Sequence, residues 1–144
     1  SVKQKLNTIN VEFRAKYEIL IGDSIVRGNT SQQIIEMARD AGAKKIYFAS
    51  ASPKIIFPNV YGIDMPYVEE LIAYQRTTEE ICKIIGADKL IYQDIEDLES
   101  AVSKLNSNIN EFDSSCFTGK YITGGVNKQY LENLNEIRGQ KNDS

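Results

Sequence analysis

The chain has 144 residues, 42% of them hydrophobic and 26% charged, which suits one globular domain with a single core and not a disordered or fibrous protein. The net charge is −3 and like charges form no long run, which argues against nucleic-acid and membrane partners. Histidine is absent, which removes the commonest general base and every Ser-His or Cys-His catalytic pair. Because the net charge is negative and basic residues form no long run, any bound anion must be held by local groups.

The sequence also indicates a cellular compartment. Its two cysteines, Cys82 and Cys116, form no C-x-x-C pair, which predicts two free thiols in a reducing environment. No apolar run approaches the roughly 20 residues that a membrane span requires, and no signal peptide is visible. We therefore expect a cytoplasmic protein. The start at Ser1, directly followed by a basic segment at residues 2–6, is interpreted as part of something longer.

Short apolar segments alternate with helical patterns along the chain. Strands are predicted at residues 17–21, 44–49, 60–63 and 90–92, where short apolar runs are flanked by polar or glycine-containing segments. Helices are predicted at residues 32–41, 78–85, 95–105 and 130–137, where apolar residues recur at helical spacing. This alternation predicts an α/β fold, a parallel sheet flanked by helices, with a helical C-terminal segment and a frayed tail at residues 139–144.

Capping residues support two of these helices. Thr30 or Ser31 is available as the N-cap of the first helix, and Gly42 stands where a C-terminal glycine belongs. The third residue after Thr77 is a glutamate, which is the spacing of a capping box, and Gly86 is expected to end the second helix.

The loop at residues 22–31 follows the first predicted strand and is the first candidate site. Ligands of an open parallel sheet bind at the carboxyl ends of its strands, where this loop must lie. Gly28 permits close approach of the backbone, hydroxyls on Ser24, Thr30 and Ser31 can donate, Arg27 adds a cation, and the following helix directs its N–H groups at the loop. These features suit a phosphate. An ordinary strand-to-helix turn remains the alternative, since neither the dinucleotide nor the Walker glycine pattern is present.

The loop also carries a resemblance to a known family. Residues 19–31, ILIGDSIVRGNTS, closely resemble the signature loop of the type I phosphoribosyltransferases in the version carried by the amidophosphoribosyltransferases. Further segments that look like the same family are IIEMARDAGAKKIYFASASP, FPNVYGIDMP, ELIAYQRT, IGADKLIYQDIEDL and EFDSSCFTGKYITG. The resemblance extends from about residue 2 to residue 134 and implies a type I phosphoribosyltransferase-like fold, present in part.

The resemblance implies the first committed step of de novo purine biosynthesis. In that reaction 5-phosphoribosyl 1-pyrophosphate (PRPP) and glutamine or ammonia give 5-phosphoribosylamine, pyrophosphate and glutamate, with Mg²⁺ as cofactor. Residues 1–138 would be the C-terminal portion of the transferase domain, and the glutaminase domain would be absent. The resemblance further implies upstream transferase and glutaminase halves as partners, a homo-oligomer in the complete enzyme, and purine nucleotides as inhibitors.

Site residues follow from the same resemblance. Asp23 would act as the catalytic carboxylate, contacting the ribose hydroxyls and Mg²⁺. The residues expected to wrap the 5-phosphate, mostly through their main chain, are Ser24, Ile25, Val26, Arg27, Gly28, Asn29, Thr30 and Ser31. Asp64 and Leu71 match positions near the path of ammonia; a strand-end cap and a core leucine are the alternative interpretations.

The chain departs from the family pattern at several positions. Gly22 stands where the family has the first of two aspartates, so one carboxylate of the ribose and Mg²⁺ site is missing; Asn29 replaces a threonine. A branch of the family holds an iron-sulfur cluster on four cysteines. Here Cys116 keeps one such position, whereas Asp113 and Asn59 occupy others, which predicts no cluster.

Three functional hypotheses remain open from the sequence. The chain is either the PRPP-binding part of an amidophosphoribosyltransferase, a non-catalytic module that binds PRPP or a nucleotide, or an inert remnant of a split or truncated enzyme. Gly22 favours the second hypothesis over the first, because it removes a carboxylate but leaves the phosphate loop.

Overall fold

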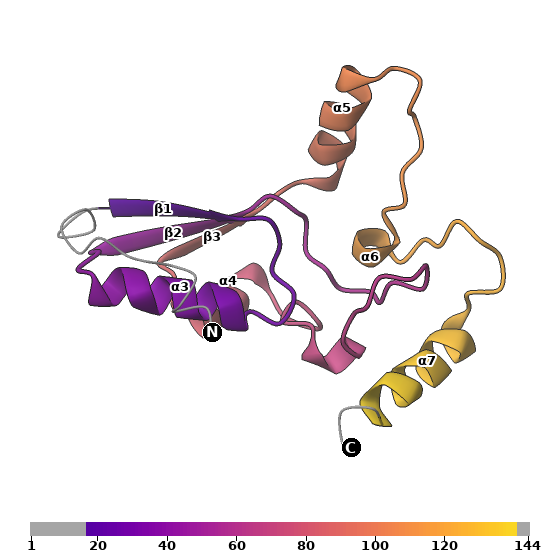
Figure 1. Cartoon of the computed structure of the whole chain (residues 1–144), viewed down its shortest axis with the longest axis horizontal. Coiled ribbons are helices and arrows are strands. Elements are labelled where there is room, and N and C mark those ends of the chain that lie inside the picture. Colours follow the sequence, from indigo (N-terminus) through magenta and orange to yellow (C-terminus); the bar gives the residue numbers. More distant parts are fainter. Residues whose placement is uncertain (1–16, 141–144) are drawn as a thin grey trace.

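The computed structural model describes residues 17–140 (Figure 1). The basic segment at residues 2–6 lies outside the described residues, as do residues 141–144 of the predicted tail. The elements, in chain order, are β1 (Tyr17–Gly22), α3 (Asn29–Asp40), β2 (Lys45–Ser50), the 3-10 turn η1 (Val68–Glu70), α4 (Thr78–Ile85), β3 (Lys89–Tyr92), α5 (Ile95–Leu105), α6 (Ser115–Thr118) and α7 (Lys128–Gln140).

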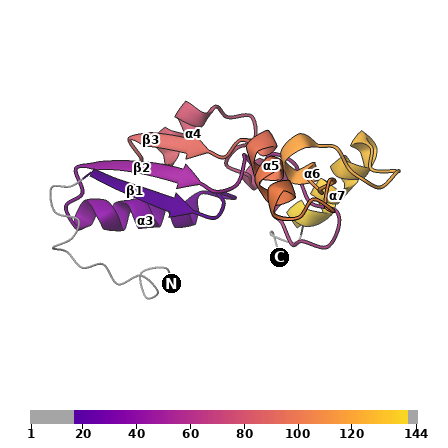
Figure 2. The ribbon, with the colours of Figure 1, turned by 90° about the horizontal axis from the view of Figure 1, so that it is seen from above.

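The sheet has three strands in the order β1-β2-β3, and both neighbouring pairs are parallel. In the register, Ile21 lies opposite Ala49 and Ala49 opposite Ile91. Helices α3 and α4 cover one face of this sheet (Figures 1 and 2). The predicted α/β architecture, a parallel sheet flanked by helices with a helical C-terminal segment, is confirmed.

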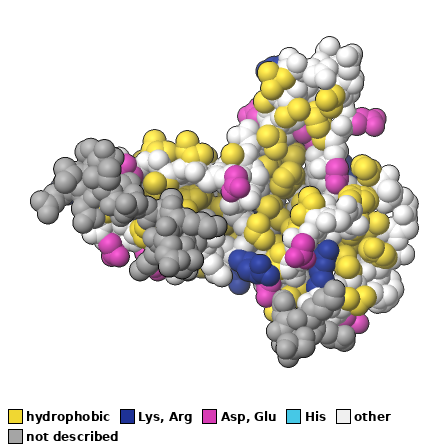
Figure 3. All heavy atoms as spheres, viewed as in Figure 1, with side chains coloured by type: hydrophobic (Ala, Val, Ile, Leu, Met, Phe, Trp, Pro, Cys, Tyr) yellow, Lys and Arg dark blue, Asp and Glu magenta, His cyan; other side chains and the backbone are white. Residues whose placement is uncertain are grey.

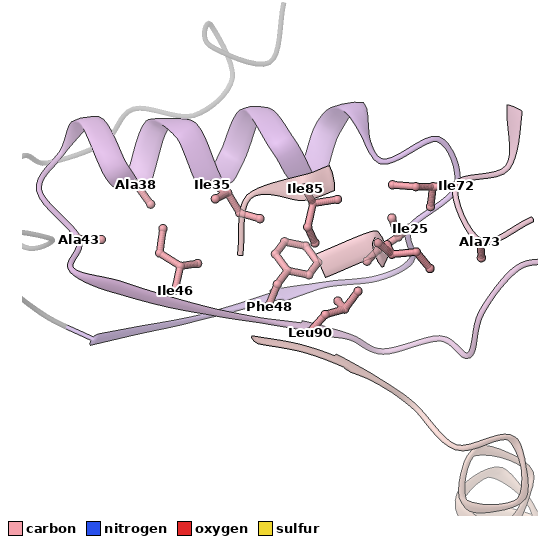
Figure 4. Close-up of a cluster of buried hydrophobic side chains, with 11 residues drawn as sticks. Ile25, Ile35, Ala38, Ala43, Ile46, Phe48, Ile72, Ala73, Ile85 and Leu90 are labelled. Atoms are coloured by element: carbon pink, nitrogen blue, oxygen red, sulfur yellow. The ribbon is translucent and has the colours of Figure 1, made fainter. Parts of the chain in front are cut away.

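The core lies between this covered face and the two helices. Figure 4 shows Ile35 of α3 directed at Ile46 and Phe48 of β2, and all three are almost fully buried. From α4, Ile81 and Ile85 join the same cluster, so one apolar core fixes the sheet against both helices. Burial of large apolar side chains is the main favourable term in such packing, at roughly 1.5 to 3 kcal/mol for each.

The opposite face of the sheet is bare in the described part of the chain. Because side chains alternate along a strand, Tyr17, Ile19 and Ile21 of β1 all point away from α3, and 73%, 68% and 76% of their respective surfaces are exposed. Tyr47 and Ile91 continue this face on the next two strands. Figure 3 shows hydrophobic side chains at the surface over the strands and along α5.

Elements α5, α6 and α7 lie beyond the carboxyl ends of the strands (Figure 2). Helix α5 has the predicted apolar positions, but none of its residues is buried and Leu105 is 88% exposed. Helix α7 is hydrogen-bonded to η1: the Val68 N–H donates to Asn135 Oδ1 at 2.7 Å, and the Asn135 side-chain amide donates to the Glu69 carboxylate. Arg138 of α7 donates to the backbone oxygen of Asn59 at 2.9 Å.

The strand expected at residues 60–63 is wrong, because this segment has no regular secondary structure. Asn59 Oδ1 accepts hydrogen bonds from the N–H groups of Tyr61 and Ile63, at 2.8 and 3.0 Å. These backbone donors are therefore satisfied by a local side chain and are not available to a neighbouring strand.

The expected N-cap of the first helix is also wrong. Helix α3 begins at Asn29, with Gly28 as its N-cap and no capping side chain, so Thr30 and Ser31 lie in the first helical turn. By contrast, the capping box of α4 is confirmed, with Thr77 as N-cap and Gly86 at the C-terminus. None of the helices within residues 17–140 is long and apolar enough to cross a membrane.

Candidate functional site

The loop between β1 and α3 lines an open cavity of about 530 Å³. Every residue from Gly22 to Ser31 lines this cavity, together with Ile34 and Phe48. The loop starts at the carboxyl end of β1 and ends in the first turn of α3. The structure thus brings all the predicted loop residues to one hollow at the edge of the sheet.

Gly28 is the residue that lets the loop turn into the helix. Its φ is +85°, in the left-handed region that side chains with a Cβ rarely adopt. A Cβ at this position would also lie 2.3 Å from Cδ1 of Ile72, which packs beneath the loop. Both the backbone conformation and the tight contact therefore require glycine here.

The loop presents several hydrogen-bond donors to the cavity. The first bond of α3 runs from the Gln32 N–H to the Gly28 oxygen at 2.9 Å. The N–H groups of residues 29–31 precede that bond and have no acceptor within the helix. Together with the positive end of the helix dipole, these donors favour an anion at this place.

Asp23 lies at the start of the loop and is exposed. Its Oδ1 accepts a hydrogen bond from the Ser24 N–H at 2.7 Å. Among residues 17–140, no three His, Cys, Asp or Glu side chains come together as a metal cluster. A single carboxylate suits Mg²⁺, which proteins often bind through one or two carboxylates, with substrate phosphates and water completing its shell. Asp23 is therefore the residue of this loop that could hold Mg²⁺.

Gly22 sits directly against the core, at the carboxyl end of β1. A Cβ built at this position would lie 3.0 Å from Cζ and 3.2 Å from Cε1 of Phe48. Phe48 is only 2% exposed, so its ring has little room to move. A side chain at position 22 therefore requires a small shift of the Phe48 ring.

Arg27 is held by a glutamate from a distant part of the sequence. Its Nε and Nη2 atoms both donate to Glu70 Oε2, at 2.9 and 2.6 Å. The Ile72 N–H, two residues further on, donates to the oxygen of Val26 at 2.8 Å. The segment that follows η1 thus contacts the loop through an ion pair and a backbone hydrogen bond.

Asp64 and Leu71 lie in different environments. Asp64 is exposed and lines a second cavity of about 580 Å³, whose wall also includes Arg27, Tyr67 and Arg138. Leu71 is fully buried, at 0% exposure. An ammonia path along these two residues remains a prediction.

The two cysteines are free thiols, as predicted. Burial raises the pKa of Cys82 and of Cys116, so neither thiol is activated as a nucleophile. Asn59 and Asp113, which the resemblance places at two of the cluster positions, both act on the pKa of the Cys116 thiol and therefore lie near it. One thiolate beside an amide and a carboxylate does not fit a cluster that takes four thiolates.

Sequence reasoning did not identify the residues that support the loop from below. Phe48 comes from β2, whereas Glu70 and Ile72 lie more than 40 positions after the loop residues that they contact. Nothing local in the sequence indicates these contacts, because they arise only when the chain is folded.

Two solved structures have a similar fold. One is a glutamine phosphoribosylpyrophosphate amidotransferase from B. subtilis complexed with ADP and GMP, with a TM-score of 0.71 and 34% identity over 88% of this chain and 29% of that chain. Another, described as the allosteric regulatory enzyme of purine biosynthesis, has a TM-score of 0.75 and 34% identity over 92% of this chain and 30% of that chain. The fold is that of a type I phosphoribosyltransferase, present in part.

Curated relatives specify the class further, although no protein-family model matches the chain. The amidophosphoribosyltransferase of Pasteurella multocida is 59% identical over 99% of this chain and 28% of its own length. That of Escherichia coli is 57% identical over 96% of this chain and 27% of its own length. The enzyme of Saccharomyces cerevisiae is 45% identical over 96% of this chain. This chain is a partial-length relative of the amidophosphoribosyltransferases, spanning little more than a quarter of their length.

Proposed function

We propose that this chain is the PRPP-binding transferase part of an amidophosphoribosyltransferase. The observation that carries the proposal is that one cavity, of about 530 Å³, is lined by every residue from Gly22 to Ser31. Its position, at the carboxyl end of a parallel strand and the start of a helix, suits a ligand with a phosphate group. High identity to amidophosphoribosyltransferases across nearly the whole chain supports PRPP as that ligand.

Different residues of the loop contact different parts of PRPP. Ser24, Ile25, Val26, Arg27, Gly28, Asn29, Thr30 and Ser31 surround the 5-phosphate, mainly with backbone N–H groups and hydroxyls. Asp23 accepts hydrogen bonds from the ribose hydroxyls. Fixing the phosphate and the ribose in this way holds the C1 carbon at a defined place, which lowers the entropic cost of the reaction.

In the proposed reaction, ammonia forms a bond to C1 and the bond from C1 to pyrophosphate breaks. Positive charge develops on the ribose as pyrophosphate leaves, so the catalytic task is electrostatic and requires no histidine. Mg²⁺, when bound, neutralises charge on the leaving pyrophosphate. Asp23 keeps a negative charge beside the ribose, and Asp64 and Leu71 border the path along which ammonia arrives.

The proposal includes partners beyond this chain. Residues 1–138 form the C-terminal portion of the transferase domain, and upstream transferase and glutaminase parts complete the enzyme, which is a cytoplasmic homo-oligomer. Purine nucleotides act as inhibitors, which is supported by the similar B. subtilis enzyme having been solved with ADP and GMP. Fractionation of cells and iron analysis of the purified protein test the cytoplasmic location and the predicted lack of an iron-sulfur cluster.

Calorimetric titration with PRPP and Mg²⁺ tests the proposal directly. The chain is compared with a Gly22→Asp variant, which restores the missing carboxylate, and with Gly22→Ala, which adds only the Cβ against Phe48. A charge-assisted hydrogen bond contributes roughly 1.5 to 3 kcal/mol, so Gly22→Asp should bind about 10 to 100 times more tightly than Gly22→Ala. Absence of PRPP binding by all three proteins would refute the proposed site.

The alternative function is a non-catalytic PRPP or nucleotide-binding module, which Gly22 favours because one carboxylate is missing. Turnover separates the two functions. With ammonia as the nucleophile and the remaining parts of the enzyme supplied, the transferase releases pyrophosphate in a PRPP-dependent manner, whereas the binding module does not. An inert remnant, the third possibility, would neither turn over PRPP nor bind it.

A further inference from the structure

The segment after η1 supports the loop that the proposed function assigns to PRPP. Leu71, Ile72 and Ala73 are at most 4% exposed, so this segment is anchored in the core. From that anchor, the Ile72 N–H donates to the Val26 oxygen at 2.8 Å. Glu70, directly before the anchor, faces the same loop through its side chain.

The contact between Glu70 and Arg27 fixes the orientation of the guanidinium. Nε and Nη2 of Arg27 both donate to Glu70 Oε2, so one edge of the planar group is used. No described residue accepts a hydrogen bond from the remaining Nη1 atom. Arg27 also lines both the loop cavity and the second cavity, so this residue lies between them.

We propose that Glu70 is a positioning residue for the loop, and that it acts through Arg27. An Arg27 side chain without a partner samples many rotamers, and immobilising such a side chain on ligand binding weakens affinity. Glu70 orders the Arg27 side chain before the ligand binds, so binding does not have to immobilise it. Glu70 thereby holds the loop in its binding conformation. The inference rests on the proposed function, because it concerns how the same loop binds a sugar phosphate.

Simple electrostatics predicts the opposite effect of removing the Glu70 charge on the affinity of the loop for an anion. Glu70 is an anion close to a site that binds an anion, so its removal should strengthen binding if charge alone mattered. Positioning through Arg27 predicts instead that Glu70→Gln weakens binding. The sign of the change therefore distinguishes the two explanations.

The neighbouring Glu69 is a matched control. It lies in the same turn and carries the same charge, but its carboxylate accepts hydrogen bonds from Asn135 of α7, at 2.8 and 3.1 Å, and not from the loop. Glu69→Gln therefore changes the net charge equally and leaves the pair between Glu70 and Arg27 intact.

The experiment measures the affinity of the full chain for ribose 5-phosphate by calorimetry. We expect Glu70→Gln to weaken binding about three- to tenfold, which is the size of the cost of ordering one long side chain, and Glu69→Gln to leave it unchanged or slightly stronger. In an Arg27→Met background, Glu70→Gln should have no further effect. Unchanged or tighter binding by Glu70→Gln, or an equal loss in both backgrounds, would overturn the proposal.

Hydrogen exchange without ligand gives a second readout. Amides of residues 26–29 should exchange faster in Glu70→Gln than in the unmodified chain, and at the unmodified rate in Glu69→Gln. Equal exchange in all three proteins would overturn the positioning role even if the loop binds ribose 5-phosphate. A chain that shows no binding of ribose 5-phosphate or PRPP refutes the proposed function, and with it this inference.

Discussion

Replacing Gly28 with alanine tests how tightly the loop is packed against the segment beneath it. The alanine would have to adopt the left-handed backbone conformation of Gly28, at φ +85°, which costs about 1 to 2 kcal/mol. Its Cβ would also lie 2.3 Å from Ile72 Cδ1. Since Ile72 is 4% exposed, this methyl group can move only by displacing packed neighbours, which costs about 1 to 3 kcal/mol. The free energy of unfolding should fall by about 2 to 5 kcal/mol in total.

A second substitution separates the two causes. Ile72→Val removes the clashing Cδ1 atom and by itself costs about 0.5 to 1.5 kcal/mol. In the double variant the steric cost disappears and only the backbone cost at Gly28 remains, so the two changes should couple by about 1 to 3 kcal/mol.

Urea unfolding followed by circular dichroism measures all four proteins. With a slope of about 1 to 3 kcal/mol/M, a loss of about 3 kcal/mol moves the midpoint of Gly28→Ala by about 1 to 3 M. Additivity within about 0.5 kcal/mol would refute the claim that Ile72 excludes a side chain at Gly28. A Gly28→Ala protein as stable as the unmodified chain would refute the backbone argument as well.

Three further substitutions test other parts of the fold. Ile19→Lys places a charge on the bare sheet face and should reduce concentration-dependent self-association of the chain in sedimentation velocity. If the unmodified chain is already monomeric, the expected self-association through this face is wrong. Thr77→Ala removes the cap of α4 and should lower the free energy of unfolding by about 1 kcal/mol in urea titrations; an unchanged midpoint would contradict this role. Hydrogen bonds from the Ile46 N–H and from Arg39 lower the pKa of Asp88 below its usual 3.8. The stabilisation by the ionised Asp88 is therefore complete above about pH 3.8 and is lost as the pH falls through the lowered folded-state pKa. The free energy of unfolding should accordingly depend less steeply on acid pH in Asp88→Asn. An unchanged acid dependence in this variant would contradict the stabilising role of Asp88.

Local patterns in the sequence predicted most of the secondary structure. The strands expected at residues 17–21, 44–49 and 90–92 agree with β1, β2 and β3 to within one residue at each end. The capping box at Thr77 was equally readable, because both of its members lie within one helical turn. Short apolar runs and caps of this kind are local properties, so the sequence contains them in full.

The two wrong predictions of secondary structure also have local causes. An apolar run at residues 60–63 resembled a strand, but the side chain of Asn59 takes up its backbone donors. The hydroxyls of Thr30 and Ser31 suggested an N-cap, whereas the positive φ of Gly28 lets the helix begin earlier. In both cases a single backbone or side-chain geometry outweighed the general preference of the residue types.

The sequence by itself determined the class of fold, the position of the loop and the resemblance of that loop to a PRPP site. Only the tertiary structure decided which distant residues support the loop, namely Phe48 against Gly22, Ile72 beneath Gly28 and Glu70 on Arg27. It also decided that one apolar face of the sheet is bare in the described residues. The physical reason is that strand and helix periodicity act between near neighbours, whereas steric contact and ion pairing between remote residues exist only after the chain has folded.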